Sequence, residues 1–100
     1  MDATSIWADA CAILEKEMVR VSYETWIHDT LKPYSLIGDT LILECLNSLM
    51  LEMGVSRFTN QIQNAVNPAS GRALKLEILC EGALVSRVRE LEATVNGNTL

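Results

Sequence analysis

A two-residue turn, Gly38-Asp39, lies between two stretches of strand-forming residues in the segment 34–45. Glycine at the first central position is what a type II′ turn requires, and two-residue turns of this kind join antiparallel strands. Beyond the turn, Leu41 and Leu43 fall on one face of the second strand. We therefore predict a β-hairpin, around which the other elements must pack.

Helical periodicity precedes the hairpin. Residues 5–18 place apolar side chains at i, i+4, i+7 and i+8, with Thr4 or Ser5 as the N-cap. A second, short helix is predicted to begin with Ser22 as its cap and to bury Trp26. Two helices should therefore lie before the sheet.

A long third helix is predicted over residues 47–66, and Asn67-Pro68 and Gly71 should stop it. The alternation in residues 73–79 then predicts a last strand. The resulting order is α-α-β-β-α-β. We expect an α+β fold with a three-stranded sheet and helices packed on one of its faces.

The C-terminal segment reads as a separate unit. We expect one domain over residues 1–80, followed by a tail or linker over residues 81–100. A narrow apolar stripe predicts a short amphipathic helix in this segment, ended by Asn96-Gly97-Asn98; the stripe consists of Leu84, Val88, Leu91 and Val95. If the helix forms, the stripe must cover apolar surface on this chain or on a second copy.

The charge balance limits which partners the chain can bind. Its 8 basic and 13 acidic residues give a net charge of −5, without a local run of Lys or Arg. A phosphate backbone is held by clustered positive charge, so we expect at most weak binding of single-stranded DNA. Such binding would use Trp7 and the scattered Lys16, Arg20 and Lys32. The acidic N-terminal segment and the absence of a long apolar run predict a cytoplasmic protein without membrane contact.

Residues that could carry catalysis are scattered. His28 stands alone, and the three cysteines, Cys11, Cys45 and Cys80, lie 34 or more residues apart. A zinc site needs several ligands at short spacings. A Cys–His nucleophilic pair stays open, because residues distant in sequence can meet in a fold, but buried structural cysteines are the favoured interpretation. We expect no cofactor, no metal and no enzymatic activity.

Several local motifs occur together along the chain. Ile6-Trp7 opens the first helix, residues 22–27 (SYETWI) form the second, residues 35–41 (SLIGDTL) cover the hairpin, and Asn47 precedes the third helix. In combination, over about residues 5–79, they resemble the N-terminal domain (domain I) of the DnaA family of bacterial replication initiators. The resemblance implies a compact KH-like fold.

The resemblance also implies a function. In the family this domain mediates self-association of initiators, contacts the replicative helicase and docks replication regulators; a homodimer is a further expectation. The position of Trp7 serves self-association there, and the positions of Ser22, Tyr23 and Leu49 contact partners. No Gly-x-x-x-x-Gly-Lys-Ser/Thr loop occurs in the sequence, so the ATPase module of a full initiator is not part of it. We expect either a fragment or a stand-alone copy of the domain.

One flank of the first helix is a candidate surface. At about 100° per residue, Trp7, Cys11 and Met18 lie beside the core stripe rather than on it. They either complete the core or, as the resemblance implies for Trp7, face a partner. Together with Ser22 and Tyr23, they are candidate partner-binding residues.

The third helix gives a second candidate surface. Most of its apolar residues share one arc and predict the core face; they are Leu51, Val55, Phe58, Ile62, Ala65 and Val66. Leu49, Met50 and Met53 fall on the opposite side, which predicts an adaptable contact surface. The alternative is that the helix bends at Gly54 and its first turn packs inward. We favour the surface, and expect these three residues and Trp7 to be more exposed than the core face.

Three positions in and before this helix depart from the pattern of the family. The family usually has a proline at the position of Leu46 and an aromatic residue at that of Leu49. It often has a tryptophan at the position of Met53.

Overall fold

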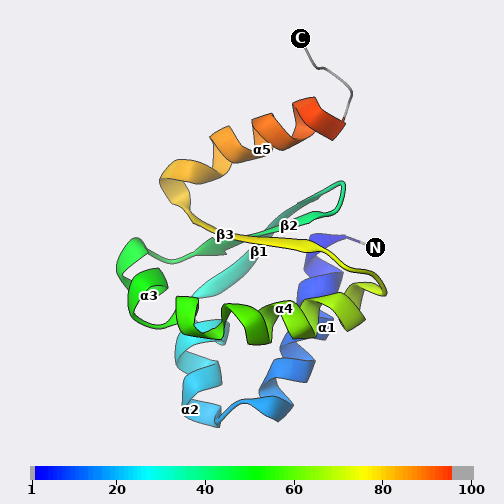
Figure 1. The fold of residues 1–100 in the computed structure, drawn as a ribbon. Helices are drawn as coiled ribbons and strands as arrows, with labels where there is room; N and C mark the ends of the chain where they lie inside the picture. Colours follow the sequence, from blue (N-terminus) through cyan, green and yellow to red (C-terminus); the bar gives the residue numbers. More distant parts are fainter. Residues whose placement is uncertain (1, 96–100) are drawn as a thin grey trace.

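The computed structural model describes residues 2–95. A three-stranded sheet lies at the centre, with α1 and α4 on one side and α5 on the other (Figure 1). The α+β class and the α-α-β-β-α-β order are confirmed, with one further helix, α5, at the end. The predicted stop at Asn96-Gly97-Asn98 lies outside the described residues.

The sheet contains β1 (Leu31–Ile37), β2 (Thr40–Cys45) and β3 (Lys75–Cys80), in the order β1-β2-β3. The predicted hairpin is confirmed, because β1 and β2 are antiparallel and joined at a Gly38 whose φ is 57°. Strand β3 then pairs with β2 in parallel. Strand β2 is therefore central, which explains why nearly all of its side chains are buried.

Strand β1 is an edge strand with an irregularity. Pro33 pairs with Leu43 and Ser35 pairs with Ile42, so Tyr34 is an extra residue without a partner on β2. This arrangement is a β-bulge. Tyr34 remains 40% exposed.

The inner face of the sheet carries the main core. Helices α1 (Ala3–Glu17) and α4 (Thr59–Ser70) pack against each other and α1 against β1, with α3 (Ser48–Met53) at one end. Ile6, Leu14, Leu41, Leu43 and Ile62 are fully buried there. Their apolar area, removed from water, is the main favourable contribution to folding.

The outer face is covered by α5 (Glu81–Val95), the helix of the C-terminal segment, whereas α1 and α4 of the predicted domain lie on the opposite face (Figure 1). Leu84 packs with Ile37 and Ile42 in a second, small core, and Leu79, Val88 and Leu91 pack around it. The apolar stripe in the C-terminal segment thus covers this chain's own sheet. Sequence periodicity identified the stripe but could not identify the surface that it covers.

The first two helices begin earlier than predicted. The N-cap of α1 is Asp2, whose carboxylate accepts a 2.8 Å hydrogen bond from the amide of Ser5, rather than Thr4 or Ser5. The short α2 (Arg20–Ser22) continues into a π-helical segment, η1 (Tyr23–His28). The helical run begins at Arg20, so Ser22 lies inside it and is not its N-cap.

The third predicted helix is not continuous: a 3-10 segment separates two α-helices. Helix α3 ends at Gly54, a 3-10 segment, η2 (Val55–Phe58), follows, and α4 then continues past Pro68. The stop is Gly71 in the left-handed conformation, with φ 75°. Pro68 has no amide hydrogen and so removes one helical hydrogen bond of α4, which continues for only two further residues.

Polar contacts fix the connection from α4 to β3. The Asn67 side chain accepts a hydrogen bond from the amide of Leu74, and the Gln63 side chain donates one to the carbonyl of Leu74. The Arg72 guanidinium contacts the Asp39 carboxylate and the Gly38 carbonyl. The hairpin turn is therefore held against the start of β3.

Candidate protein-interaction surface

An exposed apolar ridge runs along the start of α3. We define the α3 ridge as Leu46, Leu49, Met50 and Met53. Leu46, Leu49 and Met53 are 67%, 61% and 61% exposed, whereas Met50 is half-buried against the core. Exposed Leu and Met side chains grouped in this way are typical of a contact surface.

Local structure explains how the ridge is built. The last residue of β2 is Cys45, so Leu46 follows directly as the chain leaves the sheet. The Asn47 side chain accepts a 2.8 Å hydrogen bond from the amide of Met50 and thereby starts α3. Leu49 and Met53 are then four residues apart and lie on the same side of the helix.

The break at Gly54 does not turn the ridge inward. The interruption at Gly54 that the alternative interpretation required is present, because α3 ends there and η2 begins with the buried Val55. Leu49 and Met53 nevertheless stay exposed, as the favoured interpretation predicts. The predicted exposure of Leu49 and Met53 relative to Leu51, Phe58 and Ile62 is confirmed, but that of Met50 is not, because this side chain is half-buried, as Leu51 and Phe58 are. Leu51 and Phe58, expected on the core face, are half-buried at the margin of the core.

A cation–π contact lies at the end of the ridge, where the Trp26 ring packs against Gly54, the residue after Met53. The guanidinium carbon of Arg57 lies 5.8 Å from the ring centroid of Trp26 and 5.7 Å from that of Phe58. Trp26, predicted to be core, is half-buried and keeps part of its ring at the surface. Arg57 was not identified from the sequence, because its contact with Trp26 joins two helical segments that are distant in sequence. An arginine over a tryptophan is a combination that protein interfaces favour.

The flank of α1 is less exposed than expected. Trp7 is 5% exposed and Met18 9%, and Cys11 is half-buried. The expectation that Trp7 is more exposed than the core face of the third helix was wrong. Helix α1 is packed by α4, β1 and η1, so three elements bury an arc wider than a single stripe. Trp7 also leaves no open ring face on which a nucleic-acid base could stack.

Tyr23 reaches the surface only at the rim of an acidic hollow. The hollow has a volume of about 280 Å³ and is lined by Glu15, Tyr23, Glu24, His28 and Asp29. Burial, followed by the nearby Cys11 thiol, raises the pKa of Tyr23 to about 12. Tyr23 itself is 6% exposed, and Ser22 is half-buried. A partner would therefore meet the surrounding polar groups first.

His28 is paired with a neighbouring carboxylate rather than with a cysteine thiol. Its Nδ1 lies 2.9 Å from the Asp29 carboxylate, and this contact raises the pKa of the exposed imidazole. The Cys45 thiol instead donates to the carbonyl of Asn47 at 3.4 Å. Within residues 2–95, no group of three or more His, Cys, Asp or Glu could hold a metal ion.

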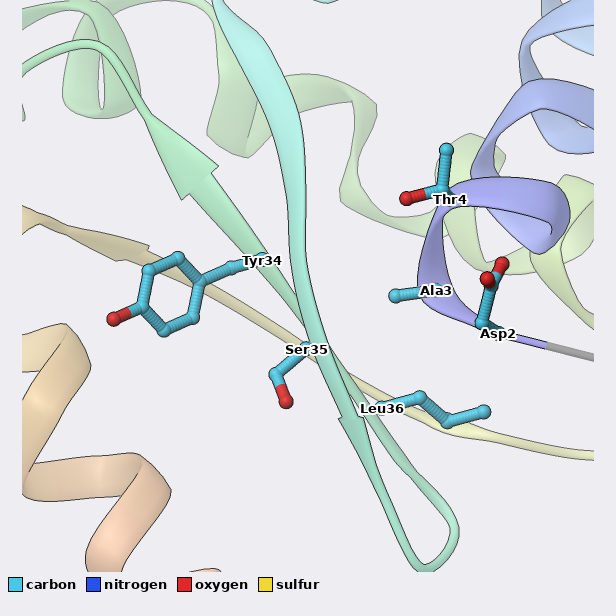
Figure 2. Close-up of a pocket in the computed structure, with 6 residues that line it drawn as sticks. All are labelled: Asp2, Ala3, Thr4, Tyr34, Ser35 and Leu36. Carbon is cyan, nitrogen blue, oxygen red and sulfur yellow. The ribbon is translucent and has the colours of Figure 1, made fainter.

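A larger hollow, of about 350 Å³, lies between the start of α1 and β1, as Figure 2 shows. Leu36 is directed toward the first turn of α1, whereas Tyr34 is directed away from it (Figure 2). The carboxylate in its lining, Asp2, is already engaged as the helix cap, and the Ser5 amide lowers its pKa. The hollow therefore offers no free carboxylate for acid–base chemistry.

None of the helices in the described part of the chain is both long and apolar enough to cross a membrane. The largest exposed apolar side chains are instead distributed over short segments. Besides the α3 ridge, they include Val19 and Val21 at the α1–α2 connection, which are 73% and 71% exposed.

Comparison with known proteins gives relatives of one kind. No family model matches the chain. It is 26% identical over 99 residues to the chromosomal replication initiator protein DnaA of Thermoanaerobacter sp. (strain X514), and the match covers 99% of this chain and 22% of the relative. It is 29% identical over 80 residues to the DnaA of Caldanaerobacter subterraneus subsp. tengcongensis, over 80% of this chain and 18% of the relative.

The chain thus spans about a fifth of the length of the curated relatives it matches. The matches cover most or nearly all of this chain, and they name the family that the sequence motifs resemble. The length is consistent with the predicted N-terminal domain. The chain is similar to a small part of DnaA.

Proposed function

We propose that this chain is a protein-interaction domain of a bacterial replication initiator and that it acts by binding, not by catalysis. The α3 ridge is the proposed contact surface, and the observation that carries the proposal is the exposure of Leu46, Leu49 and Met53. Apolar side chains left in water are stabilised when a partner covers them. The similarity to DnaA supports a partner from the replication machinery.

The replicative helicase is the proposed partner, and replication regulators would compete for the same ridge. In the resembling family, the position of Leu49 contacts partners, and this residue is 61% exposed here. Aromatic side chains and arginine are enriched in such interfaces, and Trp26 with Arg57 borders the ridge. Leu49 and Met53 would be buried on binding, with Arg57 at the rim.

Self-association with other initiator molecules is a second proposed role, but it cannot depend on a freely exposed Trp7. That side chain is 5% exposed, so a partner could touch no more than its edge. Weak binding of single-stranded DNA is disfavoured by the same burial and by Arg20, which pairs with Glu24 at 3.0 Å. Neither observation affects the α3 ridge.

The test compares two pairs of exposed apolar residues. Leu49→Ser with Met53→Ser removes the ridge, and Val19→Ser with Val21→Ser is a matched control at the α1–α2 connection, away from α3 (Figure 1). Each single change should alter the free energy of unfolding by no more than about 0.5 kcal/mol, as at ordinary surface positions. Binding to the purified replicative helicase of the source bacterium would be measured by calorimetry or surface plasmon resonance.

The ridge variant should bind at least tenfold more weakly, which corresponds to about 1.4 kcal/mol. The control variant should bind within about twofold of the unmodified domain. An equal loss in both variants, or no loss in the ridge variant, would rule out the ridge as the helicase surface. A ridge variant that unfolds would show that Leu49 or Met53 belongs to the core.

A further inference from the structure

Two cysteines occupy the last rung of the parallel ladder. Cys45 ends β2 and Cys80 ends β3, and the register pairs them directly. They are 35 residues apart in sequence, so no sequence motif joins them. Both are free thiols in the structure.

The two side chains lie on the same side of the sheet. Cys45 is 1% exposed within the inner core, and the half-buried Cys80 packs against that same core. Burial raises the pKa of the Cys45 thiol, and the neighbouring Cys80 thiol raises it further. The residues that follow them, Leu46 and Glu81, line one common hollow, which independently places the two strand ends side by side.

The spacing is compatible with a covalent link. Neighbouring strands lie about 4.7–4.9 Å apart, and a disulfide joins Cα atoms that are about 4.4–6.8 Å apart. Its Cβ atoms must come within about 3.5–4.5 Å, slightly closer than an ideal ladder places them. Because Cys45 and Cys80 are terminal residues of their strands, the required inward movement disturbs no further rung of the ladder.

We propose that Cys45 and Cys80 form a reversible intramolecular disulfide by exchange with a small-molecule disulfide such as oxidised glutathione. The half-buried Cys80 reacts first: its thiolate attacks one glutathione sulfur and displaces the other glutathione as a thiolate. Cys45 then gives up its proton and attacks the Cys80 sulfur, which releases the second glutathione. Two protein thiols are oxidised, and one glutathione disulfide is reduced to two thiols.

The third cysteine provides an internal control. Cys11 lies on α1, is half-buried and neighbours Tyr23, whose hydroxyl lowers a thiol pKa that burial raises. It is comparable to Cys80 in exposure class but is not paired with a cysteine in the sheet. The test of this link needs no partner protein, but the site adjoins the proposed partner surface: Leu46 of the α3 ridge follows Cys45 directly, and the Cys45 thiol donates to the carbonyl of Asn47.

The experiment uses the full 100-residue chain, reduced and then exposed to oxidised glutathione under folded conditions. Remaining thiols are alkylated, the protein is digested with trypsin, and the fragments are identified by mass spectrometry. Trypsin separates the three cysteines into fragments 1–16, 21–57 and 76–87, because the Lys32-Pro33 bond resists cleavage. Fragments 21–57 and 76–87 should be recovered linked, from monomeric protein, while Cys11 is alkylated.

A parallel reaction in urea measures pairing in the unfolded chain. The ratio of the Cys45–Cys80 link to the Cys11–Cys80 link should be at least tenfold higher in the folded protein. Cys11→Ser should leave the link unchanged, and Cys80→Ser, at a half-buried position, should abolish it. The proposal would be overturned if Cys80 stopped at the glutathione adduct, or if Cys11 were linked as readily as Cys45.

Discussion

The indole ring of Trp26 lies against the backbone of Gly54, and its six-membered ring fills the space that a Cβ at position 54 would occupy. The φ of Gly54 is −136°, outside the left-handed region, so the requirement for glycine comes from the ring and not from the backbone angle. Gly54 is also where α3 ends. The contact between Trp26 and Gly54 therefore lies at the point where α3, which carries the α3 ridge, ends.

Gly54→Ala should destabilise the domain by about 1–3 kcal/mol, because the indole must move to admit the methyl group. The control is Gly82→Ala in α5, where a Cβ would meet nothing within 4 Å. That change should leave stability unchanged or raise it by up to about 1 kcal/mol. Urea denaturation would measure both, and an unaltered midpoint for Gly54→Ala would contradict the packing described.

Leu84→Ala should cost about 2–3 kcal/mol, because it empties the centre of the small outer core. Its neighbour Val85 is 54% exposed, and Val85→Ala should be nearly neutral. Thermal denaturation followed by circular dichroism compares the two. Equal melting temperatures would mean that α5 does not contribute to the stability of the sheet.

The ion pair between Glu77 on β3 and Arg87 on α5 should make the stability depend on pH. Its two contacts are 2.6 and 2.7 Å, and hydrogen bonding to Arg87 lowers the pKa of Glu77 below its ordinary 4.5. The ionised form is favoured by folding, so this stabilisation is complete above about pH 4.5 and is lost as the pH falls through the lowered pKa.

Glu77→Gln should therefore reduce stability at pH 7 by no more than about 1 kcal/mol, since the pair is partly exposed. The difference in stability from the unmodified domain should shrink as the pH is lowered from 7 toward 3, which is about 1.5 pH units below the ordinary pKa of 4.5. Glu90→Gln, at the more exposed partner of Arg87, is the control and should have a smaller effect. Denaturant titrations at pH 7 and pH 3 measure the difference in the free energy of unfolding between Glu77→Gln and the unmodified domain. The same difference at both pH values would contradict this prediction.

Tyr23 should ionise late. Its pKa is raised from 10.0 to about 12 because burial disfavours the phenolate. The unfolded chain loses this proton at lower pH than the folded domain does. The contribution of the protonated Tyr23 to the free energy of unfolding is therefore complete below pH 10 and disappears as the pH rises toward 12. Ultraviolet absorbance of phenolate would follow the titration, and Tyr23→Phe should remove the late component. A Tyr23 transition near 10 in the folded protein would contradict the burial.

The hairpin and helix order could be predicted because local residues determine them. Gly38 allows the tight turn, and the alternation of side chains along the strand determines which residues of β2 share a face. The burial of Trp7 could not be predicted from one helical stripe, because it depends on how many neighbours surround α1. Likewise, the burial of Ile42 depends on α5, which lies more than 35 residues later in the chain.

The α3 ridge was predicted in part. Leu49 and Met53 could be found because they oppose the core stripe of their helix. Leu46 was missed because it lies between β2 and α3, where neither the strand period of two residues nor the helical period of about 3.6 residues applies. The pairing of Cys45 with Cys80 was hidden for another reason: parallel register depends on how β3 returns to the sheet, and the sequence alone does not encode it locally.

The bulge at Tyr34 affects what can happen at the open edge of β1. An unpaired edge is a template onto which another chain can add a strand. Here Pro33 lacks an amide donor, and the bulge beside it interrupts the regular spacing of the remaining groups. Two copies of this domain are thereby discouraged from pairing their sheets edge to edge through β1, whereas β3, the other edge strand, carries no such irregularity and is the edge at which strand addition would meet less resistance.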